Sequence, residues 1–181
     1  MAELETLSEQ GHIELFYGDE TSVSSEGYVP YGWQFCDERV YVYAARGYKL
    51  NLWGLFSRSN QSHTATSLKT IGARFVFDEL EKLSFLIEKP TVVVLDQAPI
   101  HKAALIKDQL SIWQERGLFV FYLPVYSPEL NIAEIVWRKL KGQWIRPQDY
   151  ATADTLAYAV NRCLANFGTE LTIHFSNFNK N

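Results

Sequence analysis

The chain has 181 residues, of which 47% are hydrophobic and 21% are charged, as is usual for a globular domain. It contains no run of about 18 apolar residues, so no membrane span is predicted, and its polar start MAELETLSEQGH lacks the apolar segment of a signal peptide. The formal net charge of −4 argues against a protein that coats DNA through clustered Lys and Arg, but it is compatible with a nuclease, whose metal site needs carboxylates.

The first half of the chain has the pattern of an antiparallel strand group. Residues 13–20 place apolar side chains at alternate positions, and this predicted strand ends at Asp19. After a loop rich in Gly, Pro and aromatic residues, residues 49–58 and 62–69 are predicted as a second and a third strand, separated by the turn sequence SNQS. These segments predict an antiparallel hairpin or meander.

The second half alternates helices with buried strands. Helices are predicted at residues 71–88 and 100–116, and each is followed by a continuous apolar strand, at residues 91–96 and 118–123. In the second of these helices, four residues are predicted to face the core: Ala104, Leu105, Ile112 and Trp113. A last helix is predicted at residues 153–167.

The stretch VYSPELNIAEIVWRKLKG predicts one more helix before the last. Ser127 is placed as its N-cap and Pro128 as its first helical residue. An apolar stripe then follows at Leu130, Ala133, Trp137, Leu140 and Trp144. At 100° per residue, Glu134 lies about 40° from Leu130, so its carboxylate borders the face that is predicted to be buried.

The order of these elements predicts an α/β fold. We expect one mixed sheet of about five strands, three antiparallel and then two parallel, flanked by helices. The ribonuclease-H-like architecture has this order, although other α/β folds produce it as well. No repeat or linker divides the chain, so residues 1–181 are predicted to form one domain.

Three carboxylates are predicted to meet at one edge of this sheet. Asp19 and Asp96 end strands one and four, and Glu134 is carried by the helix after the fifth strand. Three like charges oppose one another's ionisation unless a counter-charge is present. Mg²⁺ and Mn²⁺ suit such oxygen ligands, and two such ions about 4 Å apart promote phosphodiester displacement. We therefore expect these three residues to be catalytic metal ligands.

Each acid has a plainer explanation when it is taken alone. Asp19 can close a turn, and Asp96 can cap the helix that follows it. Glu134 can pair with Arg138, four residues further on. The coincidence of three acids at one sheet edge favours the metal site. Glu20 is left out of this site, because it should point to the face of the strand opposite to Asp19.

Three segments also carry a longer pattern: YGDET, VVVLDQAPIH and FYLPVYSPELNIAEIVWRKLKG. They resemble the catalytic domain of DDE-type transposases of the mariner-like insertion-sequence superfamily, the DDE superfamily endonucleases. The family pattern is an Asp in a strand, then Asp-Asn-x-x-x-His, then Leu-Pro-x-Tyr-Ser-Pro-x-Leu-Asn-Pro-x-Glu with a Trp three residues later. Its three metal-binding acids correspond to Asp19, Asp96 and Glu134. Gln97 replaces the usual Asn, and Ile132 and Ala133 replace the usual Pro-Ile.

The resemblance implies an insertion-sequence transposase that uses two Mg²⁺ or Mn²⁺ ions. One ion activates water to cut the ends of the element, and the freed 3′-OH then attacks target DNA, typically at a TA dinucleotide. The implied partners are double-stranded DNA, an N-terminal DNA-binding segment or co-encoded chain, and a second copy in a DNA-bound homodimer. The helix-turn-helix domain that precedes the catalytic domain in this family is expected to be absent, because the sequence starts just before the first catalytic strand.

Several residues near these motifs have two explanations. His101 matches the family's His, and it either steers a phosphate or a metal-bound water or bonds the backbone at a helix start. A basic group after Glu134 either contacts DNA phosphates or forms a solvated helix face: Arg138, Lys139, Lys141 and Arg146. Trp33 either stacks on an unpaired base or packs half-buried, and the packing role is favoured.

The sequence leaves two other functions open, an inactive remnant and a host-type nuclease. A catalytically inactive remnant that acts only as the partner of a full-length protein is the main alternative, although the three intact acids favour an enzyme. A host-type nuclease of the same fold is disfavoured by the SPELN…E…W match. Cys36 and Cys163 have no metal-ligand spacing and predict a reduced cytosolic protein, with a disulfide as the less favoured alternative. The resemblance implies the prokaryotic cytosol, with association to the nucleoid when the protein is active.

Overall fold

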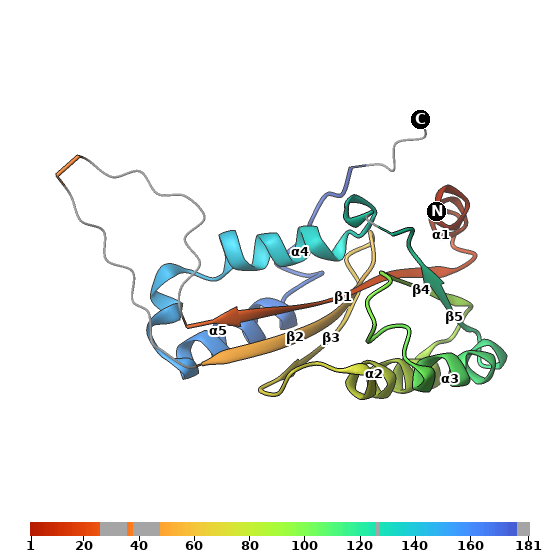
Figure 1. Ribbon diagram of the computed structural model, residues 1–181. Helices are drawn as coiled ribbons and strands as arrows, with labels where there is room; N and C mark the ends of the chain where they lie inside the picture. The colour runs from red at the N-terminus through yellow and green to blue at the C-terminus, as the bar shows by residue number, and fades with distance from the viewer. Residues whose placement is uncertain (26–35, 38–47, 126, 177–181) are drawn as a thin grey trace.

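The computed structural model describes residues 1–25, 36–37, 48–125 and 127–176 (Figure 1). A helix, α1 (Ala2–Glu9), precedes three strands, and helices and strands then alternate. The elements that follow α1 are β1 (Glu14–Ser24), β2 (Lys49–Phe56), β3 (Ser62–Ser67), α2 (Ala73–Leu86), β4 (Thr91–Leu95), α3 (Ala104–Glu115), β5 (Leu118–Tyr122), α4 (Ala133–Lys139) and α5 (Ala153–Ala165). In this part of the chain, no helix has both the length and the apolar character that crossing a membrane requires.

The five strands form one mixed sheet in the order β3-β2-β1-β4-β5. β1 pairs antiparallel with β2, and β2 pairs antiparallel with β3. β4 lies parallel to β1 and β5 lies parallel to β4. The predicted fold class, three antiparallel strands followed by two parallel ones, is confirmed.

Helices cover both faces of the sheet (Figure 1). On one face, Leu80 of α2 and Trp113 of α3 pack with apolar side chains of β1, β2 and β4. On the other face, Trp137 of α4 and Leu156 of α5 pack with side chains of β1 and β2. Burial of these apolar surfaces supplies the main stabilisation of such a layered fold.

β1 is longer than the sequence predicts. It continues past Asp19 to Ser24, because β2 pairs with it from Tyr17 to Ser24. Its pairing with β4 covers only Glu14 to Tyr17. The prediction that Asp19 ends the strand is therefore wrong. Asp19 lies in the middle of β1, beyond the part that pairs with β4.

The helix predicted to start at Ser127 is divided. Pro128–Leu130 form a 3₁₀ turn, α4 begins only at Ala133, and Leu140–Trp144 form a π-helical turn after it. Asn131 lies between the first two and is buried. Its Nδ2 donates to the Gly18 carbonyl (3.1 Å), and its Oδ1 accepts from the Ala133 N–H (3.1 Å). Asn131 thus attaches the start of α4 to the middle of β1.

α1 is not predicted from the sequence, because a tertiary contact rather than an apolar stripe holds it. Its Glu5 is only 4% exposed. The Glu5 carboxylate accepts a hydrogen bond from the Tyr17 hydroxyl and one from Arg58 Nε (2.7 Å). Arg58 also donates to the Ser176 carbonyl (2.9 Å). A buried carboxylate is stable only when it is paired in this way.

The segment after α5 returns to the turn between β2 and β3. The Asn60 side chain both donates to the Ile173 carbonyl (3.2 Å) and accepts from the Ile173 N–H (2.7 Å). Gly168 makes the turn after α5 with a φ of +89°, and its N–H donates to the Leu171 carbonyl (2.9 Å). Gly168 fits closely against this turn, since a Cβ at Gly168 would lie 2.2 Å from the Asn60 carbonyl oxygen.

Candidate active site

A cavity of about 330 Å³ opens where β4 and β5 end, beside the middle of β1. Asp19, Asp96 and Glu134 all line it, together with residues of the loop after β5. These three acids come from β1, from the residue that follows β4, and from the first turn of α4. The structure thus brings the three predicted acids to one cavity.

Close approach of α4 to the sheet places Glu134 near Asp19. Asp19 lies opposite Gly54 of β2, and a Cβ at Gly54 would come within 2.7 Å of the Trp137 ring. The missing side chain therefore leaves room for Trp137 of α4 directly beside Asp19. Together with the Asn131 bonds to β1, this contact fixes the helix that carries Glu134.

Asp96 is held in a tight turn after β4. Its Oδ1 accepts a hydrogen bond from the Ala98 N–H (2.9 Å) and lies 2.6 Å from Nδ1 of His101. The hydrogen bond from His101 lowers the pKa of Asp96. Half of the Asp96 side chain remains exposed (52%), while His101 is fully buried. Asp96 is therefore a carboxylate with one fixed oxygen at the edge of the cavity.

The pKa of Asp19 is shifted in the opposite direction to that of Asp96. Burial raises its pKa, and the nearby negative charges of Glu20, Asp96 and Glu134 add to this effect, so that its pKa reaches about 7. The carboxyl group of Asp19 therefore holds a proton near neutral pH unless a cation compensates its charge. Such a pKa is the expected sign of a site where several carboxylates converge.

The arrangement fits a hard divalent cation by the chemistry of its donors. Among the described residues, no group of three or more Asp, Glu, His or Cys side chains has a spacing that could hold an ion as it stands. The three carboxylates nevertheless face one cavity, and oxygen ligands of this kind suit Mg²⁺ and Mn²⁺. Binding would require side-chain rotation, which exposed carboxylates such as Asp96 and Glu134 allow.

The sequence matches the family model described as DDE superfamily endonuclease over residues 14–157, most of the chain. The chain belongs to the DDE superfamily of endonucleases. No curated protein matches it. The segment that matches the family model contains all three candidate acids of this DDE-superfamily chain.

Solved structures with the same fold are transposases and retroviral integrases. A Mos1 transposase paired-end complex with the left transposon end has a TM-score of 0.52 and 16% identity over 93% of this chain and 60% of that chain. The catalytic core of BIV integrase has a TM-score of 0.55 and 14% identity, covering 88% and 86%. The HTLV-2 integrase catalytic core in complex with magnesium has a TM-score of 0.52 and 14% identity, covering 84% of each chain. At these identities the likeness shows the ribonuclease-H-like fold alone, and this chain spans about 60% of the Mos1 chain.

The members of the predicted basic group differ in exposure: Arg138 and Arg146 are exposed, while Lys139 and Lys141 are partly buried. Lys141 is half-buried, and its Nζ donates to the Thr21 hydroxyl of β1 (2.6 Å). Burial lowers its pKa, and the nearby Asp19 opposes this. Arg138 is exposed, and Lys139 donates to Gln143 (3.2 Å). Lys141 therefore faces the acids, while Arg138 faces solvent.

Two of the remaining predictions concern His101 and Trp33, and Gln97 is the residue that replaces the family's usual Asn. His101 is placed by Asp96 and by Tyr122, whose hydroxyl donates to the His101 carbonyl (2.8 Å). The Gln97 amide donates to the Leu123 carbonyl (2.8 Å) and ties the turn after β4 to the end of β5. Trp33 lies outside the described residues.

One residue near the site was not predicted from the sequence. Oε2 of Glu20 lies 3.2 Å from Nε2 of His101, although the two groups lack hydrogen-bond geometry. Burial alone lowers the pKa of His101, but its contacts with Asp96 and Glu20 outweigh this and raise the pKa to about 9. The sequence did contain one indication of this role. Glu20 follows Asp19 directly on the strand, so its side chain points to the opposite face of the sheet beside the same site.

Asp19→Asn should stabilise the metal-free protein at pH 8. The pKa of Asp19 rises from 3.8 to about 7 on folding, so the folded state binds more protons between these values and loses stability as the pH rises through them. The amide removes this loss, so we expect a gain of about 1–3 kcal/mol at pH 8 and almost none near pH 4. Urea denaturation in EDTA at both pH values measures this difference in the free energy of unfolding. A variant that is less stable than wild type at pH 8 would contradict the raised pKa of Asp19.

Proposed function

We propose that this chain is the catalytic domain of an insertion-sequence transposase, which cleaves transposon-end DNA and joins the 3′-OH to target DNA. The observation that carries the proposal is the convergence of three carboxylates, from β1, from the end of β4 and from α4, on one cavity. Membership of the DDE superfamily of endonucleases supports the same reaction class. The alternative of a host-type nuclease shares the site but lacks the joining step.

Asp19, Asp96 and Glu134 would hold the divalent cations, two in the complete site. When bound, Mg²⁺ or Mn²⁺ supplies the positive charge and Lewis acidity that phosphodiester displacement requires. The presence of magnesium in the HTLV-2 integrase core supports this assignment. The proton that Asp19 holds near neutral pH has to leave as the site forms, because only the carboxylate is a strong ligand.

The other side chains around the cavity position the acids and the DNA. Asn131 holds the start of α4 against β1, so that Glu134 faces the cavity. Lys141 lies beside Asp19 and partly offsets its negative charge. Arg138 is exposed one helical turn after Glu134, where it would contact a DNA phosphate, and His101 fixes Asp96.

Double-stranded DNA, both transposon ends and a TA-type target, is the proposed substrate, and a DNA-bound homodimer is the proposed assembly. The net charge of −4 predicts weak, salt-sensitive DNA binding by this chain alone. An N-terminal DNA-binding segment or a co-encoded chain would therefore supply most of the affinity. The paired-end complex of Mos1 transposase with a transposon end supports a DNA-bound assembly. The prokaryotic cytosol is the proposed location.

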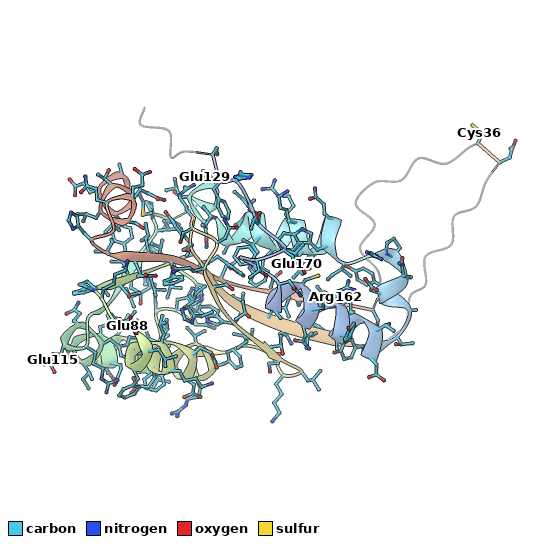
Figure 2. All side chains as sticks on the ribbon, turned by 180° about the vertical axis from the view of Figure 1, so that it is seen from behind. Cys36, Glu88, Glu115, Glu129, Arg162 and Glu170 are labelled. Carbon is cyan, nitrogen blue, oxygen red and sulfur yellow. The ribbon has the colours of Figure 1, made fainter. Side chains whose placement is uncertain are left out.

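Calorimetric titration with Mn²⁺ tests the site directly. Wild type should bind Mn²⁺, and Asp96→Asn and Glu134→Gln should each weaken binding more than tenfold, because each removes a charged ligand. Glu129→Gln is the matched control, since Glu129 lies at the surface on the turn before α4 and does not line the cavity (Figure 2). Binding that neither variant changes would contradict the proposed site.

A DNA-joining assay with the wild-type protein then distinguishes the alternative functions. A transposase joins a labelled oligonucleotide with a free 3′-OH to plasmid DNA in the presence of Mn²⁺, whereas a hydrolytic nuclease only cuts the plasmid. An inactive remnant does neither. A wild-type protein that neither binds Mn²⁺ nor performs either DNA reaction would favour the inactive remnant over the transposase.

A further inference from the structure

The pairing between β1 and β4 ends short of the candidate site. Tyr17 opposite Val94 is the last residue pair of the two strands in the described ladder. Asp19 and Asp96 both lie beyond this pair, on strands that no longer share backbone hydrogen bonds. Backbone pairing between β1 and β4 therefore does not fix the separation of these two acids, and side-chain contacts contribute to it.

His101 spans this gap between the two strands. Its Nδ1 lies 2.6 Å from Oδ1 of Asp96, and its Nε2 lies 3.2 Å from Oε2 of Glu20, the neighbour of Asp19 on β1. The ring is fully buried and packs edge-on against Trp53, with ring centroids 5.6 Å apart. The buried ring thus lies between two carboxylates, bonded to Asp96 and in close contact with Glu20.

His101 has one acid on each side, Glu20 on β1 and Asp96 after β4. These contacts on both sides place the ring between the two strands at the level where their backbone pairing has ended. Removing Glu20 would leave Nε2 buried against an uncharged surface, and His101 would hold Asp96 less firmly.

On the basis of the proposed function, we infer that Glu20 is a positioning residue, which acts through His101 to hold Asp96 beside Asp19. Glu20 does not line the cavity and takes no part in the reaction itself. Its role is the one that partners of metal-ligating side chains commonly have: they orient the ligand, and their loss typically weakens metal binding 10–100-fold.

Glu20→Gln tests this role, because it keeps the shape of the side chain and removes its charge. The Glu20 side chain is 34% exposed, so the change leaves no cavity. We expect Mn²⁺ affinity, measured by calorimetry, to fall about tenfold. The control is Glu14→Gln, which breaks an ion pair with Lys89 (3.1 Å) at the other end of β1 and should leave the affinity unchanged.

Thermal unfolding without metal separates positioning from stability. If Glu20 only stabilises the fold, Glu20→Gln and Glu14→Gln lower Tm by similar amounts and both keep wild-type Mn²⁺ affinity. That result would overturn the inference while leaving the proposed function intact. Wild type that binds no Mn²⁺ would overturn both. Weakened affinity in Glu20→Gln alone, at a Tm similar to that of the control, supports the positioning role.

A double variant tests the path through His101. In His101→Asn, the amide nitrogen takes the place of Nδ1 and keeps a donor for Asp96, but the link to Glu20 is lost. Adding Glu20→Gln to this background should therefore weaken Mn²⁺ binding no further. A second, independent loss of affinity in the double variant would show that Glu20 does not act through His101 and would overturn the inference.

Discussion

Glu134→Gln should reduce Mn²⁺-dependent DNA cleavage by at least about 10³-fold, equivalent to about 4 kcal/mol of transition-state stabilisation. Glu134 lines the cavity from the first turn of α4, and the amide keeps its size while removing the charge that a divalent ion requires. Because Glu134 is exposed, the change should cost little stability. Nicking of supercoiled plasmid at fixed Mn²⁺ concentration measures the effect.

Glu129→Gln is the matched control for this prediction as well. Glu129 is an exposed acid on the Pro128–Leu130 turn, a few residues before Glu134. Its removal should leave both the nicking rate and the thermal unfolding curve at wild-type values. More than a tenth of wild-type activity in Glu134→Gln, with the control unchanged, would mean that Glu134 is an ordinary surface residue of α4.

Gly168→Ala should lower the free energy of unfolding by about 3–5 kcal/mol. Gly168 has a φ of +89°, which an L side chain rarely adopts, and a Cβ there would lie 2.2 Å from the Asn60 carbonyl oxygen. This oxygen belongs to the backbone of the β2–β3 turn, so it cannot move aside as a flexible side chain does. Urea denaturation measures the loss, which should appear as a Tm lower by about 10 °C.

The control for Gly168→Ala is a glycine with a similar backbone and open space around it. Gly11 has a φ of +76°, and a Cβ there would meet nothing within 4 Å. Gly11→Ala should therefore cost only the backbone strain, about 1 kcal/mol. If both variants lose the same free energy of unfolding, the contact of the new Cβ with Asn60 does not destabilise the protein.

The sheet was predictable because its strands have distinct patterns. β4 and β5 are continuous apolar runs between helices, and β1 to β3 precede them as short alternating segments. The buried face of α3 was predicted less well. Trp113 is buried as expected, but Leu105 and Ile112 are 36% and 41% exposed, and Ile106 is buried instead. Two apolar stripes one residue apart are equivalent in sequence, and the choice depends on tertiary contacts such as the hydrogen bond from Trp113 to Glu81 (2.6 Å).

The convergence of the three acids was also predictable, since strand ends and helix starts of such folds meet at one edge. What surrounds them was not predictable. The sequence pattern shows no reason for β1 to continue to Ser24, because this extension depends on β2. Without the extension, neither the contact of Glu20 with His101 nor that of Lys141 with Thr21 can be inferred. Both belong to elements distant in sequence.

Arg58 joins the two ends of the described chain. Its side chain binds Glu5 of α1 and the Ser176 carbonyl at the same time. Terminal segments usually fray separately, and their amide protons then exchange with solvent at unrelated rates. Here one guanidinium binds both segments, so opening either end removes one partner of the Arg58 side chain that the other end also binds. The two ends therefore belong to one cooperative unit of local unfolding, although they are as far apart in sequence as the described chain allows.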